Sequence, residues 1–286
     1  MIGLEIPFPH IDPVAIWLGP IAIKWYGLAY LAGLLLGSYY IRNLLSTPSL
    51  WPNGIAPFEA SKVDDLLIYM TVGVIVGGRL GSVLLYEPST YLHDPLRIFM
   101  IWKGGMAFHG ALAGTGVAAW LFAKHNNYNL WSTMDLCAAA VPIGLFFGRL
   151  ANFINAELFG RPTDVAWGMV FPSVASTFPQ LAALEPTPRH PSQLYEAGLE
   201  GLAIFLVLRF LTHHRAGFHN RGSIIATFLI GYAFARSFSE LFRQPDPAHA
   251  LTFGVLTPGI AYSIPMLLIG CYFMHIALRN RAASKA

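Results

Sequence analysis

The sequence predicts an all-α membrane protein, a bundle of about seven transmembrane helices with a small outer cap between the fourth and fifth spans. Three observations favour this class. Hydrophobic residues make up 55% of the 286-residue chain and charged residues only 12%, whereas soluble domains average about 25% charged residues. Apolar runs as long as a helix that crosses a bilayer recur along the chain. The mean hydropathy is +0.52, and a globule of this size has too little interior to bury so much apolar surface.

Each predicted span is an apolar run of roughly 20 residues, the length at which an α-helix crosses hydrocarbon. The runs are too long and too unalternating for barrel strands, so helices remain as the way to satisfy the backbone in lipid. The whole chain, 1–286, is predicted to be a single polytopic domain. A proline-rich connection at about 149–192, irregular or with short strands, forms the outer cap. The predicted spans are 20–41, 66–86, 105–123, 131–148, 193–211, 222–242 and 258–278.

Lysine and arginine are unevenly divided between the two sides, and this division sets the expected orientation. With the N-terminus outside, the outer connections hold six basic residues among more acidic ones. The sequence therefore predicts an outside N-terminus and a cytoplasmic C-terminus. Nine of the 18 basic residues fall in the inner segments: Arg42, Lys62, Lys124, Arg209, Arg215, Arg221, Arg279, Arg281 and Lys285.

Several classes of partner and cofactor are not expected. The basic residues are scattered and form no stripe, so no nucleic-acid partner is expected despite a pI near 8.9. Cys137 and Cys271 lie inside apolar runs, where cysteine acts as a small hydrophobic side chain. The histidines of "HHRAGFH", residues 213–219, lie in a charged inner connection and are expected to be solvated. Without an HExxH, a CxxC or a glycine-rich phosphate loop, no metal or other cofactor is expected.

Glycines recur at every fourth position in the second span. Gly73, Gly77 and Gly81 in "GVIVGGRLG" share one helix face, and this small-xxx-small pattern is typical of close helix packing. In the third span, Gly110 and Gly114 of "KGGMAFHGALAG" are expected to let another backbone or a substrate approach closely.

Three charged residues lie within two helical turns in the sixth span, "YAFARSFSELFRQPD". Arg236, Glu240 and Arg243 stand at i, i+4 and i+7 and therefore share one helix face. A charge inside a membrane is costly and needs a partner or a purpose. One interpretation is an internal salt-bridge ladder, in which Glu240 neutralises both arginines. The other is a phosphate site, because two arginines around one glutamate leave a net positive charge.

Polar residues also gather at the outer end of the fourth span, in "GRLANFINAELFGR". Arg149 and Asn152 stand at i and i+3, and Glu157 and Gly160 follow two turns later or in a break after the helix. Snorkelling of Arg149 to lipid headgroups is the alternative interpretation. That alternative does not explain why two asparagines and a glutamate accompany the arginine. We therefore expect Arg149 and Arg236 to point into one shared anion site.

Single residues near the outer ends of other spans each allow two interpretations. His109 lies about one turn into the third span, as a structural residue or a reactive group. Tyr26 in "IKWYGLAY" is either an aromatic-belt residue or part of the site. The stretch "RHPSQLYE" opens the fifth span and brings Gln193, Tyr195 and Glu196 to the membrane boundary.

Four sequence blocks in order resemble the bacterial phosphatidylglycerol–prolipoprotein diacylglyceryl transferase family. "GRLANFINAELFG" resembles its signature G-R-x-[GA]-N-F-x-N-x-E-x-x-G, and the other blocks are "GGMAFHGALAG", "HPSQLYE" and "RSFSELFRQPD". The resemblance implies transfer of a diacylglyceryl group from phosphatidylglycerol to the lipobox cysteine of a prolipoprotein, in the bacterial cytoplasmic membrane. It also implies that Arg149 and Arg236 contact the phosphatidylglycerol headgroup. Activity is further implied to depend on Tyr26, His109, Asn152, Glu157, Gly160, Glu240 and Arg243.

The implied chemistry agrees with these residue types. A cysteine thiol has a pKa of about 8.5 and histidine one of about 6.5, so His109 suits the role of the base that removes the thiol proton. Glu157, or a cation that lowers the thiol pKa, are alternatives. Fixed guanidinium groups would stabilise the phosphate leaving group as the C–O bond opens.

Two functions of other classes compete with this one. Buried arginines also serve as counter-charges in a transporter or channel for a small anion. Such a protein is expected to carry polar residues on both membrane sides, whereas the polar blocks here lie near the outer side. A non-catalytic lipid-binding scaffold is the second alternative, but it has no need of His109.

Overall fold

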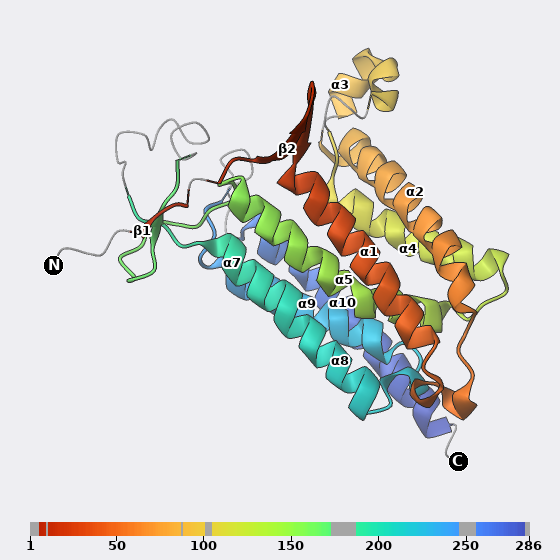
Figure 1. Cartoon of the computed structure of the whole chain (residues 1–286). Coiled ribbons are helices and arrows are strands. Elements are labelled where there is room, and N and C mark those ends of the chain that lie inside the picture. The colour runs from red at the N-terminus through yellow and green to blue at the C-terminus, as the bar shows by residue number, and fades with distance from the viewer. Residues whose placement is uncertain are drawn as a thin grey trace. The chain divides into compact units, whose positions relative to one another are not determined.

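The computed structural model describes residues 6–9, 11–86, 88–100, 105–172, 187–245 and 256–283, and these are mostly helical (Figure 1). The chain divides into two compact units, one of Tyr40–Cys137 and one of Met1–Tyr39 with Ala138–Ala286. The single polytopic domain stays a prediction.

A helix lies in each of the seven predicted ranges. The helices are α1 (Trp25–Leu45), α2 (Val63–Gly81), α4 (Phe108–His125), α5 (Leu130–Ile154), α8 (Ile204–His214), α9 (Ser223–Glu240) and α10 (Pro258–Ala283). A π-helical turn, η4 (Ser82–Tyr86), continues α2. The fifth range begins as α7 (Ser192–Glu196) and passes through a π-helical turn, η8 (Ala197–Ala203), into α8. Short helices α3 (Pro88–His93) and η5 (Pro95–Phe99) follow η4.

Three of the described helices are long and apolar enough to cross a membrane: Ala60–Leu84, Leu130–Ile154 and Gly259–Arg281. Large apolar side chains also remain exposed on these and other helices, such as Leu35 on α1 at 57% and Leu268 on α10 at 65%. Soluble proteins rarely expose contiguous apolar surface of this kind, and lipid accounts for it. The membrane class is therefore supported, while the number of seven crossings stays a prediction.

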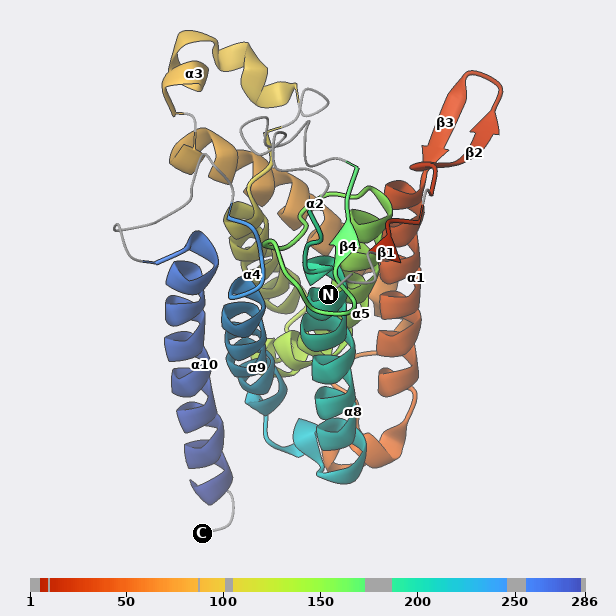
Figure 2. The same ribbon diagram turned by 90° about the vertical axis from the view of Figure 1, so that its left-hand side faces the viewer.

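Two of the predicted ranges differ in their bounds from the helices that the structure describes. The first range, 20–41, begins in a strand, because β3 (Ile21–Lys24) pairs antiparallel with β2 (Val14–Leu18) before α1 starts at Trp25. Figure 2 shows this hairpin projecting beyond the end of α1. The fourth range, 131–148, ends too early, since α5 continues to Ile154. Arg149 and Asn152 consequently lie on a helix, where backbone geometry fixes their positions.

In the unit Tyr40–Cys137, helices α2 and α4 pack against each other through the glycines at which close packing was predicted. A Cβ atom on Gly81 would lie 2.7 Å from the Gly110 Cα, and one on Gly77 would lie 2.7 Å from the Gly114 Cα. A Cβ on Gly114 would overlap the carbonyl oxygen of Gly73. The two backbones are therefore in direct contact, and only glycine permits this distance.

This contact predicts opposite effects for two glycine substitutions on one helix. Gly114→Ala is expected to lower the free energy of unfolding by about 2 kcal/mol, because the new methyl group forces the helices apart. Gly116→Ala should leave stability unchanged or raise it by up to about 1 kcal/mol through helix propensity, since nothing lies within 4 Å of its Cβ position. Unfolding in detergent measures both, and equal stabilities would contradict the packing.

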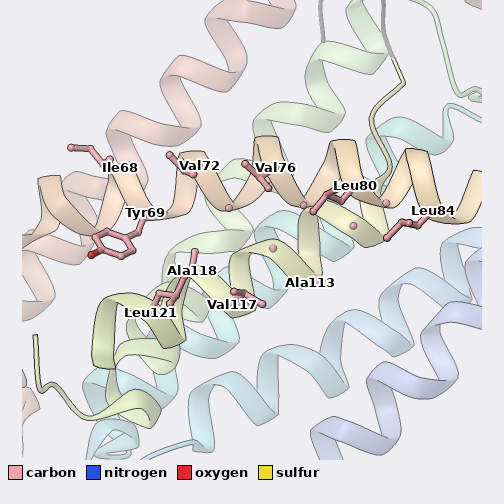
Figure 3. A pocket seen from close by; sticks show the side chains of 15 residues that line it. Ile68, Tyr69, Val72, Val76, Leu80, Leu84, Ala113, Val117, Ala118 and Leu121 are labelled. Carbon is pink, nitrogen blue, oxygen red and sulfur yellow. The ribbon is translucent and has the colours of Figure 1, made fainter. Parts of the chain in front are cut away.

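An apolar pocket of about 650 Å³ lies along the same two helices. Figure 3 shows aliphatic side chains of α2 and α4 around it, with Tyr69 at one end. The glycines of the α2–α4 contact form its floor. Such a lining suits hydrocarbon and offers no charge to an anion.

A buried arginine holds the connection after α2. Arg79 is 5% exposed. Its guanidinium donates to the carbonyl oxygens of Ile98 and Gly105, both at 2.9 Å, and of Arg97, and it lies over the Tyr91 ring. Backbone carbonyls take up this cation, so its role is structural.

In the other unit, α5 has close neighbours on two sides (Figure 1). A Cβ on Gly33 of α1 would lie 3.0 Å from the Gly144 Cα, and one on Gly201 of η8 would lie 2.7 Å from the Phe146 Cβ. Helix α10 packs against α9 through Gly270, whose Cβ would lie 2.9 Å from a side-chain atom of Ile230. These close contacts bring the side chains of α5, α7, η8 and α9 within reach of one another.

The described residues that follow α5, 155–172, are irregular apart from one short strand, β4 (Met169–Val170), which pairs in parallel with β1 (Ile6–Pro7). Phe8, Phe159 and Phe171 form a buried cluster with Ala156. Part of the predicted cap, residues 173–186, lies outside the described residues. Its outer location stays a prediction.

Candidate active site

Six charged residues from α5, α7, η8, α9 and the residues just after α9 form one buried network. Glu196 and Glu200 are fully buried, and Glu240 is 4% exposed. The arginine side chains are exposed by 17% or less. The members are Arg149, Glu196, Glu200, Arg236, Glu240 and Arg243.

Glu196 lies at the centre of this network. Its Oε1 accepts hydrogen bonds from Arg236 Nη1 at 2.9 Å and Arg243 Nη1 at 3.3 Å. Its Oε2 lies 2.8 Å from Arg149 Nε. One carboxylate thus touches all three guanidinium groups, which come from α5, from α9 and from the residues just after α9.

Glu200 lies one turn further along and contacts two of the arginines. Its Oε2 accepts from Arg149 Nη2 at 3.0 Å and from Nε at 3.3 Å, and its Oε1 lies 3.5 Å from Arg236 Nη1. The structure therefore brings Arg149 and Arg236 together on the same two carboxylates, as expected for a shared site.

The predicted salt-bridge ladder on α9 is only partly formed. Arg236 Nη2 donates to Glu240 Oε2 at 2.6 Å, the i, i+4 pair. Arg243, however, pairs with Glu196. Gly259, at the start of α10, lies against the Glu240 carboxylate, since a Cβ there would sit 2.6 Å from Glu240 Cδ. The free N–H groups of a helix N-terminus favour a carboxylate in such a position.

The phosphate-site interpretation gave this site a net positive charge. The residues that the structure describes there contradict that charge. Three guanidinium groups face three carboxylates, so the formal charges cancel. Sequence reasoning placed Glu196 at the membrane boundary but did not assign it to the site, and it missed Glu200. The signal was present in "YEAGLE", where two glutamates at i and i+4 share a helix face in an apolar span.

A second set of polar residues extends from the end of α5. Asn152 is 5% exposed. Its Nδ2 donates to Glu157 Oε1 at 2.8 Å and to the Tyr26 hydroxyl at 3.4 Å. The Tyr30 hydroxyl donates to that of Tyr26 at 3.4 Å. The structure thus brings Tyr26, Asn152 and Glu157 together, as a relay of groups that can donate or accept hydrogen bonds.

Gly160 lies where two other segments cross the chain after α5. Its N–H donates to the His190 carbonyl at 2.8 Å. A Cβ there would lie 2.5 Å from that oxygen and 2.6 Å from the Phe242 oxygen. Gln193 Nε2 donates to the Glu157 carbonyl at 2.6 Å. Gly160 therefore acts through the close packing of its backbone, which holds the segments of Glu157 and Arg243 in place.

His109 is the second residue of α4 and belongs to the other compact unit. Its side chain lies outside what the structure describes, so its role as a base stays a prediction. Among the described residues, no group of three or more His, Cys, Asp or Glu side chains could hold a metal ion.

Long apolar helices and a buried network of three arginines and three carboxylates define a helical membrane protein with a buried charged site. The family model for prolipoprotein diacylglyceryl transferases matches residues 13–276. The chain belongs to this family.

Curated relatives carry the name phosphatidylglycerol–prolipoprotein diacylglyceryl transferase. The one from Rhizobium leguminosarum bv. trifolii is 47% identical, over 97% of this chain and 95% of its own length. Those from Phenylobacterium zucineum and Paramagnetospirillum magneticum are each 49% identical, over 96% and 97% of both chains respectively.

Proposed function

We propose that Arg149 and Arg236 together receive the phosphate of phosphatidylglycerol in the diacylglyceryl transfer that characterises this family. Membership of the family makes the chain an enzyme that moves a diacylglyceryl group from phosphatidylglycerol to a prolipoprotein. It gives no support to the alternative of an anion transporter or channel. The observation that carries the proposal is the convergence of the two arginines on Glu196 and Glu200, which puts them within reach of one anion.

The proposed reaction forms a thioether at the lipobox cysteine of the prolipoprotein. The thiolate sulfur attacks the glyceryl carbon of the lipid, the bond from that carbon to the phosphate oxygen breaks, and glycerol phosphate leaves with the bonding electrons. Negative charge grows on the departing oxygen, and guanidinium groups fixed beside it stabilise the transition state more than the ground state. Arg149 and Arg236 are 17% and 13% exposed, so little water competes with this interaction.

The remaining predicted residues are proposed to orient the headgroup or the arginines. Tyr26 and Asn152 carry hydroxyl and amide groups that match glycerol hydroxyls. Glu157 fixes the Asn152 amide, and Glu240 and Arg243 fix Arg236 and Glu196. We propose His109 as the base that takes the thiol proton, with Glu157 as the alternative.

The proposed setting is the bacterial inner membrane, with the N-terminus outside, the C-terminus in the cytoplasm and the site near the outer leaflet. The lipid would enter sideways from the bilayer, and the signal peptide would present its cysteine at the same depth. The distribution of Lys and Arg supports this orientation.

The test uses purified full-length protein in detergent with phosphatidylglycerol labelled in its acyl chains and a synthetic lipobox peptide. We expect the label on the cysteine and one glycerol phosphate released for each peptide modified. A peptide with serine in place of the cysteine should stay unlabelled. Release of glycerol phosphate without label on the peptide would contradict the proposed transfer.

A further inference from the structure

The charge balance of the buried network poses a problem for a site that binds a phosphate. Three carboxylates already neutralise the three arginines. Adding an anion to a buried neutral cluster leaves an uncompensated negative charge, which is costly away from water. A phosphate that binds Arg149 and Arg236 therefore competes with a carboxylate that already bridges these two arginines.

We infer that Glu200 is this carboxylate: it occupies Arg149 and Arg236 in the free protein as an internal counter-anion, and the phosphate displaces it. Glu200 thereby sets the affinity of the site for phosphate. The inference rests on the proposed function of the two arginines.

The contacts distinguish Glu200 from Glu196. Glu196 contacts all three arginines, with its two shortest N···O distances at 2.8 and 2.9 Å. Glu200 contacts two arginines at 3.0 to 3.5 Å. Each of the two glutamates has one buried oxygen without a hydrogen bond to any residue that the structure describes, Oε2 of Glu196 and Oε1 of Glu200, so the number of arginines and the N···O distances distinguish them. Glu200 is thus the more weakly held of the two carboxylates and the less costly one to displace.

Glu240 is a poorer choice for displacement. Its Oε2 accepts from Arg236 Nη2 at 2.6 Å and its carboxylate lies against Gly259 of α10, so it has no contact with Arg149. Only Glu196 and Glu200 bridge Arg149 and Arg236 among the described residues. A phosphate that binds both arginines takes the position of a bridging carboxylate, and Glu200 is the weaker bridge.

The local backbone supports the same assignment. Glu200 lies in the π-helical turn η8, and π-turns inside helices often occur at functional sites. The next residue, Gly201, lets this turn approach α5, since a Cβ there would lie 2.7 Å from Phe146 Cβ. The carboxylate is therefore held in reach of Arg149 by backbone packing rather than by its hydrogen bonds alone.

The test is calorimetric titration of the full-length protein in detergent with sn-glycerol 1-phosphate, which carries the leaving group's phosphate. Glu200→Gln keeps the size of the side chain and removes its charge. We expect its Kd to fall about tenfold below that of wild type, because the phosphate no longer competes with a carboxylate. Glu200→Asp retains the charge and should bind within about threefold of wild type. Glu196→Gln should bind more weakly, because all three arginines lose their shared anchor.

Each other outcome has a distinct meaning. Weaker binding in Glu200→Gln would show that Glu200 only positions the arginines, and tighter binding in both Gln variants would show a general charge effect; either result overturns the inference. If Arg149→Gln and Glu200→Gln both bind like wild type, the proposed phosphate site itself fails. A structure of wild type with sn-glycerol 1-phosphate provides a measurement without substitutions. We expect the Glu200–Arg149 pair, 3.0 Å in the free protein, to open beyond about 4 Å, and an intact pair would overturn the inference.

Discussion

Replacing Arg149 by glutamine is expected to lower kcat/KM for diacylglyceryl transfer on the order of a thousandfold. Loss of one fixed donor to a developing oxyanion costs about a hundred- to a thousandfold. Arg149 supplies several donors and also holds Glu196 and Glu200, so the effect lies at the upper end. The measurement is label transfer to a lipobox peptide over a series of phosphatidylglycerol concentrations.

Two further variants make the Arg149 result specific. Arg149→Lys keeps the charge but not the planar fork of donors, so it should retain less than about a tenth of the activity. Arg209→Gln removes an exposed arginine on α8 and should transfer like wild type. Arg149→Gln at more than about a third of the wild-type rate would remove Arg149 from the proposed mechanism, given the size of the effect expected.

Replacing His109 by glutamine is expected to lower kcat about a hundredfold at neutral pH, because general bases contribute about 10²- to 10⁴-fold. A free thiol ionises near pH 8.5, so the variant should regain rate as the pH rises through that value. With increasing pH, the rate of wild type should rise earlier than that of the variant, at the pH where the base loses its own proton. The profiles of the two proteins, measured with the same peptide, give this comparison.

The control for His109 is His93→Gln on α3, an exposed histidine that should leave the profile unchanged. If the rate of His109→Gln is lower than that of wild type by the same factor at every pH, the result would indicate a structural role for the histidine. In that case Glu157, whose Oε1 accepts from Asn152, becomes the residue to test as the base.

The positions of the helices could be predicted from apolar runs alone, because lipid requires a minimum length of apolar helix. The close-packing face of α2 was also predictable, since glycines spaced four apart leave one face without side chains, whereas its partner α4 was known only from the structure. The residues at which the helices begin and end could not be predicted in this way. The segment Ile21–Lys24 is as apolar as the first turn of a transmembrane helix. Its pairing with Val14–Leu18 is what identifies it as a strand.

The arginines of the site could be predicted from the sequence, but the net charge of the site could not. Arg149 and Arg236 could be predicted because a charge in an apolar span is costly and indicates a functional role, and because both residues lie in the family motifs. Glu196 and Glu200, the carboxylates that bridge the two arginines, come from another helical segment, and a sequence does not give the rotation of one helix against another. The facing of Glu196 and Glu200 toward α5 and α9 depends on the close packing of Gly201 against Phe146, which is a property of the fold.

The convergence of Arg149 and Arg236 on one phosphate is tested most directly by an experimental structure of the full-length protein with sn-glycerol 1-phosphate bound. We expect oxygens of a single phosphate group within about 3.2 Å of nitrogens of both guanidinium groups. A phosphate bound by only one of these arginines, or at another place on the protein, would contradict the account.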